Sequence, residues 1–192
     1  MKTIIVGTNR PQSNSRKIAN VIIEIYKKMG ESNIEIIDLA ELPLNELNGS
    51  KYGLSTNSTA IDNAISKIKS SEGLIMIVPE YNGSMPGALK YFIDFWPYPA
   101  AFEKRPVAFV GLGGMFGGLR PIEHLQQVFG YRNSYIFPER IFLMNVWKMI
   151  TNDQINEPSA LERLTKQAQG FSKFCRALAN EKLDANSIQA ET

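Results

Sequence analysis

The chain has 192 residues and a formal net charge of +2 at neutral pH, and 44% of its residues are hydrophobic. This composition is typical of a globular protein, and its 14 glycines and 10 prolines exclude a low-complexity chain. The single cysteine excludes an internal disulfide and a zinc site made of cysteines alone, so a reducing cytoplasm is the expected location.

Hydropathy and charge argue against two classes of partner. The apolar stretch after Lys2 ends at Gly7, too soon for a signal peptide, and no run of about 18 apolar residues predicts a membrane span. Residues 1–28 hold six bases and one acid, whereas residues 29–80 hold three bases and eight acids. A nucleic acid needs a continuous basic surface, so this local excess favours a small anion near the N-terminus.

The predicted elements alternate between strand and helix. Apolar runs typical of buried strands lie at residues 2–7, 34–38, 74–78, 107–111 and 135–143. Helical spacing of apolar residues is found at 13–29, about 59–68, 86–96, 119–129 and 158–179. This alternation predicts an α/β fold with one parallel sheet and helices on both faces. We expect one domain over residues 1–183 and a disordered tail over 184–192, where the periodicity is lost.

Two strand orders are compatible with this alternation, and they agree on where a ligand would bind. In both, the ligand lies beyond the carboxyl ends of the strands, at the point where the winding direction reverses. The loops that follow the first, third and fourth strands are therefore the most informative segments, and all three have unusual compositions.

The loop after the first strand is rich in hydrogen-bond donors. It has one glycine where a dinucleotide-binding loop has three, and Gln12-Ser13-Asn14 stands where a Walker loop has Gly-Lys-Ser/Thr. It offers hydroxyls, an amide, a guanidinium and the free N–H groups of a helix start, from Thr8, Arg10, Ser13, Asn14 and Ser15. This set favours a terminal phosphate monoester, whereas any single serine could serve only as a helix N-cap.

The loops after the third and fourth strands are rich in glycine and proline. Residues 79–87 read Pro-Glu-Tyr-Asn-Gly-Ser-Met-Pro-Gly, a turn suited to presenting backbone groups to a flat heterocycle. Residues 111–118 hold five glycines, which would let a planar group approach the backbone closely. In the flavodoxin-like order 2-1-3-4-5 the first, third and fourth strands are neighbours, so one ligand could contact all three loops.

These segments resemble the NADPH-dependent FMN reductase family, which has a flavodoxin-like fold and includes quinone, chromate and azo-dye reductases. The resemblance rests on Gly7-Thr8-x-Arg10-x-x-Ser13-x-Ser15, on Pro79 to Lys90 with Asp94, and on Gly113 to Gly118. It implies a five-stranded parallel sheet in the order 2-1-3-4-5 with helices on both faces. It also implies FMN as the bound cofactor and NADPH or NADH as the co-substrate.

The resemblance assigns cofactor contacts position by position. The residues implied to hold the FMN phosphate are Thr8, Arg10, Ser13, Asn14 and Ser15. Those implied to border the isoalloxazine are Pro79, Glu80, Tyr81, Asn82 and Gly83 on one side, and Gly113, Gly114 and Gly117 on the other. No catalytic acid or base is assigned, because the flavin carries the chemistry.

The implied activity is hydride transfer from the nicotinamide to the flavin and then to a small acceptor, such as a quinone, an azo compound, a metal oxyanion or free flavin. Relatives form homodimers or homotetramers, so a homo-oligomer is expected. Two alternatives stay open: a flavodoxin-type electron carrier that does not oxidise NAD(P)H directly, and a regulatory protein that has lost the flavin. The near-neutral charge disfavours the carrier, and the intact polar loop disfavours the regulatory protein.

Three further features have simpler interpretations. His124 has no second histidine, so a solvated or structural role is expected rather than a metal ligand. Cys175 shares the final helix with Phe171, which predicts a small core residue rather than a reactive thiol. The aromatic segment from Trp96 to Phe102 either packs locally or contributes to a subunit contact.

Overall fold

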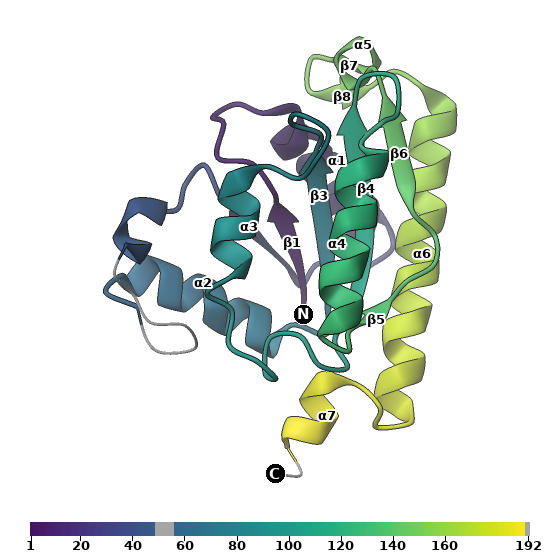
Figure 1. The fold of residues 1–192 in the computed structure, drawn as a ribbon. Coiled ribbons are helices and arrows are strands. Elements are labelled where there is room, and N and C mark those ends of the chain that lie inside the picture. The colour runs from purple at the N-terminus through teal and green to yellow at the C-terminus, as the bar shows by residue number, and fades with distance from the viewer. Residues whose placement is uncertain (49–55, 191–192) are drawn as a thin grey trace.

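The computed structural model describes residues 1–48 and 56–190, and it has three layers, with a sheet between two sets of helices (Figure 1). The sheet is parallel and has the order β2-β1-β3-β4-β5, with β6 also paired to β4. Its strands are β1 (Lys2–Val6), β2 (Ile34–Asp38), β3 (Gly73–Pro79), β4 (Pro106–Gly113), β5 (Tyr135–Ile136) and β6 (Ile141–Met144). The flavodoxin-like strand order expected from the sequence is confirmed.

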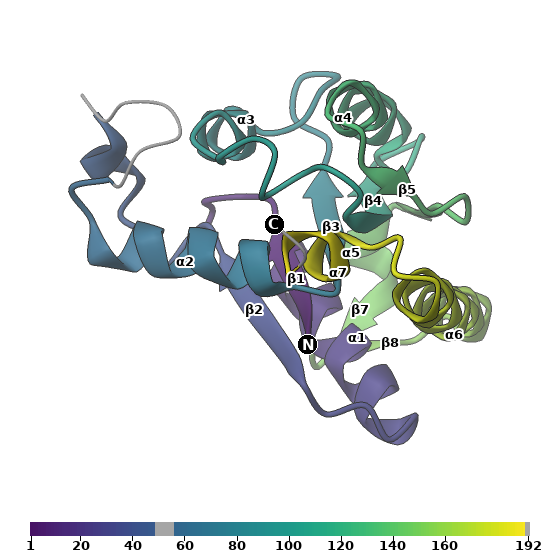
Figure 2. The ribbon, with the colours of Figure 1, turned by 90° about the horizontal axis from the view of Figure 1, so that it is seen from below.

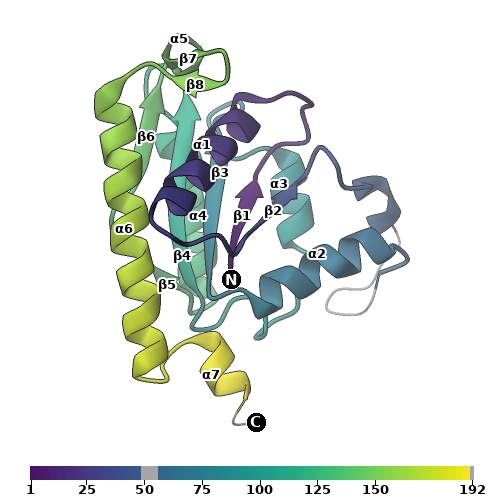
Figure 3. The ribbon, with the colours of Figure 1, turned by 180° about the vertical axis from the view of Figure 1, so that it is seen from behind.

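Helices cover both faces of this sheet. One face packs against α2 (Thr59–Ser70), α3 (Gly87–Ile93) and α4 (Leu119–Tyr131). The other face packs against α1 (Asn14–Lys28) and the long α6 (Pro158–Asn180). Figure 1 shows α3 and α4 in front of the sheet, and Figure 3 shows α1 and α6 in front of it. The shorter elements are η1 (Leu44–Leu47), α5 (Val146–Met149), α7 (Ala185–Gln189) and the antiparallel pair β7 (Ile150–Thr151) and β8 (Gln154–Ile155).

The alternation of side chains along each strand divides the core into two clusters. Ile5 packs in the cluster on the α2, α3 and α4 face, whereas its neighbours Ile4 and Val6 pack toward α1 and α6. Because both faces are covered, the central strands β3 and β4 are apolar along their whole length, as is usual in parallel sheets. Each fully buried aliphatic or aromatic side chain of this kind contributes about 1.5–3 kcal/mol to stability.

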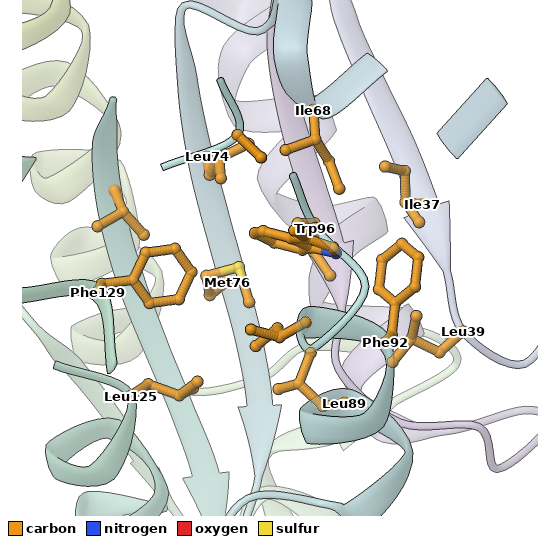
Figure 4. Packing of buried hydrophobic residues seen from close by; sticks show 14 of the residues in the cluster. Ile37, Leu39, Ile68, Leu74, Met76, Leu89, Phe92, Trp96, Leu125 and Phe129 are labelled. Carbon is orange, nitrogen blue, oxygen red and sulfur yellow. The ribbon is translucent and has the colours of Figure 1, made fainter. Parts of the chain in front are cut away.

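Trp96 occupies the middle of the first cluster. Its side chain is fully buried, and its ring lies 6.0 Å from that of Phe129 (Figure 4). The Phe102 ring lies 5.3 Å from that of Trp96. Of the two interpretations of the Trp96–Phe102 segment, local packing therefore holds for Trp96 and Phe102. Tyr98, between them in sequence, is 42% exposed.

The fifth position of the sheet is filled by two short strands rather than by one strand over 135–143. β5 pairs with the start of β4 and β6 with its end. Pro138 lies between them and has no N–H to donate to a ladder, which accounts for the interruption. The buried Gln167 amide of α6 bridges the gap, donating to the carbonyls of Phe109 at 2.9 Å and Glu139 at 2.7 Å.

The C-terminal segment corrects one expectation. Residues 184–192 were expected to be a disordered tail, but α7 lies within them, and only 191–192 fall outside the described residues. Asp184 caps α7 by accepting from the Asn186 backbone N–H at 3.1 Å, and Ala185 is buried. The buried Arg105 guanidinium donates to the carbonyls of Lys69 and Ala100 and to the Asn186 side chain. A five-residue helix has too little periodicity to be visible in sequence, and tertiary contacts hold it.

The six strands of the main sheet all point the same way, so the loops after β1, β3, β4 and β6 meet at one edge of that sheet (Figure 1). Seen from below, the opposite edge carries α7 and the N-terminus (Figure 2). Every helix within the described ranges is too short or too polar to cross a bilayer.

Candidate functional site

The loop after β1 ends in a capped helix with one unused hydroxyl. Ser13 is the N-cap of α1, and its Oγ accepts from the Arg16 backbone N–H at 3.2 Å. The Ser15 hydroxyl is buried and has no hydrogen-bond partner among the described residues. The first N–H groups of any helix also lack intrahelical acceptors. The start of α1 therefore has donors that the protein itself leaves unused.

Tyr81 ties this first loop to the loop after β3. Its hydroxyl lies 2.7 Å from Oγ1 of the fully buried Thr8, which also accepts from the Arg10 N–H at 3.3 Å. The Arg10 guanidinium carbon lies 4.0 Å from the centroid of the Tyr81 ring, a cation–π contact. Gly7, just before Thr8, packs closely against α3, because a Cβ there would lie 2.9 Å from the Leu89 side chain.

The loop after β3 is a tight turn held in place by α4. The backbones of Tyr81 and Ser84 exchange hydrogen bonds at 2.9 and 3.1 Å around Asn82 and Gly83, both of which have positive φ. Asn and Gly are the residues that such a turn favours. Glu80 forms an ion pair with Arg120 at 3.1 Å. The Ser84 hydroxyl lies 2.9 Å from Nδ1 of the exposed His124, so the lone histidine braces this turn.

The glycine-rich segment after β4 divides into two parts. Gly113 and Gly114 face the space between the loops, and Gly114 has no side chain nearer than Trp147, whose Cη2 would lie 3.6 Å from an added Cβ. Gly117 and Gly118 instead fold back with φ of 58° and 83° onto the backbones of β6 and β4. Gly117 is buried there and does not line the cleft.

Together these loops enclose a cleft of about 640 Å³ at the carboxyl edge of the sheet. Among the residues predicted from the sequence, those lining it are Arg10, Ser13, Asn14, Ser15, Pro79, Glu80, Tyr81, Asn82, Gly113 and Gly114. Three predicted residues do not line it. Thr8 lies beneath it, bonded to Tyr81, Gly83 lies on the side of the turn nearest Arg120, and Gly117 packs against β6.

Five further residues line the cleft that sequence reasoning did not single out: Pro11, Gln12, Leu112, Val146 and Trp147. The last two come from α5, which no periodicity predicts because it is four residues long. One signal was available: Trp147 follows the last predicted strand by four residues, and a parallel sheet places that segment at the same edge as the other loops.

The charges around the cleft leave one basic side chain without a carboxylate. Arg16 contacts Asp38 at 3.0 Å and Glu41 at 2.9 Å, and the hydrogen bond to Asp38 raises the pKa of Arg16 above its ordinary value. Arg120 is paired with Glu80. Arg10 has no carboxylate within ion-pair distance in the described part of the chain, so its charge is available to an anion in the cleft.

The chain matches the family model described as NADPH-dependent FMN reductase over residues 2–148. It belongs to that family. This FMN reductase family member is 30% identical over 150 residues to an NAD(P)H:quinone oxidoreductase of Solanum tuberosum, a match that covers 75% of this chain and 74% of the relative. It is 29% identical over 127 residues to an FMN-dependent NADPH-azoreductase of Staphylococcus aureus, covering 65% of this chain and 66% of that one, just under two thirds.

A solved structure supports the fold of this family member. The apo form of an NADH:FMN oxidoreductase named EmoB superposes with a TM-score of 0.73, at 19% sequence identity, covering 88% of this chain and 87% of the other.

Cys175, on the far side of the family member's core from the cleft, is buried as predicted, and burial raises the pKa of its thiol to about 12. It takes no part in the site.

Proposed function

We propose that the protein is an FMN-dependent NAD(P)H oxidoreductase that reduces a small electron acceptor. Family membership supports this assignment, and so do the activities named for the potato and staphylococcal relatives. With a quinone as acceptor, NAD(P)H and one proton from solvent give NAD(P)⁺ and the hydroquinone, a transfer of two electrons. When bound, FMN supplies the hydride chemistry that amino-acid side chains lack.

The part of the cleft formed by Arg10 and the start of α1 fits a phosphate. The observation that carries this assignment is the Ser15 hydroxyl at the start of α1, which is buried and has no partner within residues 1–48 and 56–190. A buried hydroxyl left unpaired costs about 1–3 kcal/mol, so its retention here is explained if a ligand oxygen accepts from it. Ser13 and Asn14 line the cleft beside it, the N-terminal end of the helix dipole favours an anion, and Arg10 adds a charge.

The other part of the cleft fits a flat ring. Gly113 and Gly114 present backbone without side chains, facing the turn formed by Pro79 to Asn82. A volume of about 640 Å³ lies within the range of about 300–1,000 Å³ typical of cofactor pockets. The residues that would hold FMN are therefore Arg10, Ser13, Asn14 and Ser15 for the phosphate, and Pro79 to Asn82 with Gly113 and Gly114 for the ring.

The protein's own part in this reaction is to bind and orient. Arg10 and the start of α1 would neutralise the phosphate. The face of the Tyr81 ring holds the Arg10 guanidinium, and the Tyr81 hydroxyl holds the loop after β1 through its contact with Thr8. The Glu80–Arg120 ion pair and the Ser84–His124 hydrogen bond hold the turn that would border the ring. Held at near-attack distance, a hydride donor and acceptor need no nucleophilic side chain, and none is assigned.

We further propose that residues 1–183 form one FMN-binding domain, that the protein acts in the cytoplasm, and that it is a homodimer or homotetramer. The location is supported by the single buried cysteine, and the oligomer by the resemblance to family members. Sedimentation velocity at micromolar concentration tests the oligomer, and a stable monomer would contradict it.

Equilibrium dialysis against FMN, followed by steady-state assays with NADPH and NADH, tests the function. The acceptors are quinones, azo dyes, chromate and free flavins. Wild-type protein is expected to bind one FMN per chain and to oxidise nicotinamide with at least one acceptor class. The double variant Arg10→Ala and Ser13→Ala is expected to release FMN. Tight FMN binding without any NAD(P)H oxidation would favour a flavodoxin-type carrier instead.

A further inference from the structure

Two aromatic side chains line the cleft, and only one is already engaged. The Tyr81 ring carries the Arg10 guanidinium on its face, and its hydroxyl is bonded to Thr8. Trp147 makes no comparable ring–ring or cation–ring contact with the described residues, and it is 56% exposed. Trp96, by contrast, is completely buried. A tryptophan this exposed leaves a large apolar surface that a ligand in the cleft could cover.

The fold fixes Trp147 in this position. Val146, its neighbour on α5, is buried in the core and anchors the helix. The Asn145 backbone N–H donates to the Gly114 carbonyl at 3.1 Å, which ties the start of α5 to the glycine segment. The six-membered edge of the indole lies over Gly114, since an added Cβ would be 3.6 Å from Cη2. The indole therefore stands at the end of the cleft where the ring of the cofactor would lie.

Further exposed apolar side chains lie on the two segments that meet beside Trp147, next to Gly114 and Asn145 in the sequence. Met115 and Phe116 follow Gly114 and are 74% and 47% exposed, and Met144 precedes Asn145 and is 51% exposed. The polar groups from Arg10 to Ser15 line the same cleft. The exposed apolar side chains at and beside Trp147 suit an apolar, flat molecule better than a compact hydrated ion.

Resting on the proposed function, we propose that Trp147 is a specificity-determining residue that contacts the electron acceptor and favours planar aromatic acceptors over compact inorganic ones. A ring–ring contact contributes about 0.5–1.5 kcal/mol beyond the area it buries, which corresponds to about a 2- to 12-fold change in a dissociation constant. The preference of the enzyme for a naphthoquinone over ferricyanide should therefore depend on the indole by about that factor.

The test uses FMN-loaded wild type, Trp147→Ala and Trp147→Phe, with Tyr131→Ala as the control. Tyr131 is an 80% exposed aromatic residue at the end of α4 that does not line the cleft. The first readout requires no turnover: calorimetric titration of each oxidised holoprotein with 2-methyl-1,4-naphthoquinone in the absence of nicotinamide. The second readout is kcat/KM for the same quinone and for ferricyanide, and the third is the Kd for FMN.

Trp147→Ala is expected to weaken quinone binding and lower kcat/KM for the quinone by about 2- to 12-fold. Ferricyanide kinetics and FMN affinity should not change, Trp147→Phe should retain most of the quinone affinity, and Tyr131→Ala should match wild type. Unchanged quinone binding in an active Trp147→Ala enzyme would overturn this inference and leave the proposed function intact. A loss of FMN affinity or of oligomeric state in Trp147→Ala would also overturn it, because the indole would then serve the cofactor or a subunit contact. Wild type that neither binds FMN nor oxidises NAD(P)H would refute both.

Discussion

Replacing Ser15 by alanine should have opposite effects on the stability of the FMN-free protein and on its affinity for FMN. The hydroxyl is buried and is unpaired among the residues that the structure describes, so its removal should leave the free protein equally stable or up to about 1–3 kcal/mol more stable. A hydrogen bond to a charged group contributes about 1.5–3 kcal/mol, so the same change should weaken FMN binding by about 10- to 150-fold. Stability and affinity should therefore move in opposite directions.

Urea unfolding of the FMN-free protein and equilibrium dialysis with FMN measure the two quantities. Thr3 provides a matched control, because its hydroxyl is also buried with no partner in the described part of the chain, but it lies in β1, away from the cleft. Thr3→Val should be neutral or stabilising and should leave the Kd for FMN unchanged. If Ser15→Ala binds FMN as tightly as wild type, the phosphate does not bind at the start of α1, and the placement of the cofactor is wrong.

Three further predictions concern stability and reactivity. Gly118→Ala should destabilise the protein by at least about 1–2 kcal/mol, measured by urea unfolding. The reason is that φ at this position is 83° and the added Cβ would lie 2.5 Å from a β4 backbone nitrogen. The control Gly130→Ala, within α4, should be neutral or stabilising. Burial acts to raise the pKa of Glu31, but hydrogen bonds, first from Lys2, outweigh it and hold that pKa below its ordinary value of 4.5. The contribution of Glu31 to stability is therefore complete above about pH 4.5 and is lost as the pH falls through the lowered pKa. Glu31→Gln should reduce the loss of unfolding free energy below pH 4.5. An unchanged pH dependence in that variant would contradict the role given to Glu31. Burial raises the pKa of Cys175 to about 12, so iodoacetamide at pH 8 should label it only after unfolding.

The sequence predicts the layers of this fold well because each long element has a clear apolar pattern. The run Leu74 to Val78 is a central strand, and α6 begins at Pro158 as its helical spacing indicates. The pattern does not show that Pro138 interrupts the fifth strand, since the flanking residues stay apolar. It also misses α7, which depends on the distant Arg105 for its place.

The candidate site could be predicted by position but not in detail. The three loops meet because their strands are neighbours, a consequence of topology that strand order already implies. Which glycines face the cleft depends on backbone conformation: Gly114 lines it, while the positive φ of Gly117 turns that residue toward β6. Trp147 enters the site only because a buried valine anchors a four-residue helix, a tertiary contact that no local pattern shows.

The central claim is that one cleft holds FMN and lets a nicotinamide reduce it. The most direct measurement is the visible absorbance of the FMN-loaded protein as NADPH or NADH is added without oxygen. The flavin absorbance is expected to disappear with one equivalent of nicotinamide per bound FMN and to return when a quinone is admitted. Absorbance that persists in excess NADPH and in excess NADH would contradict the account.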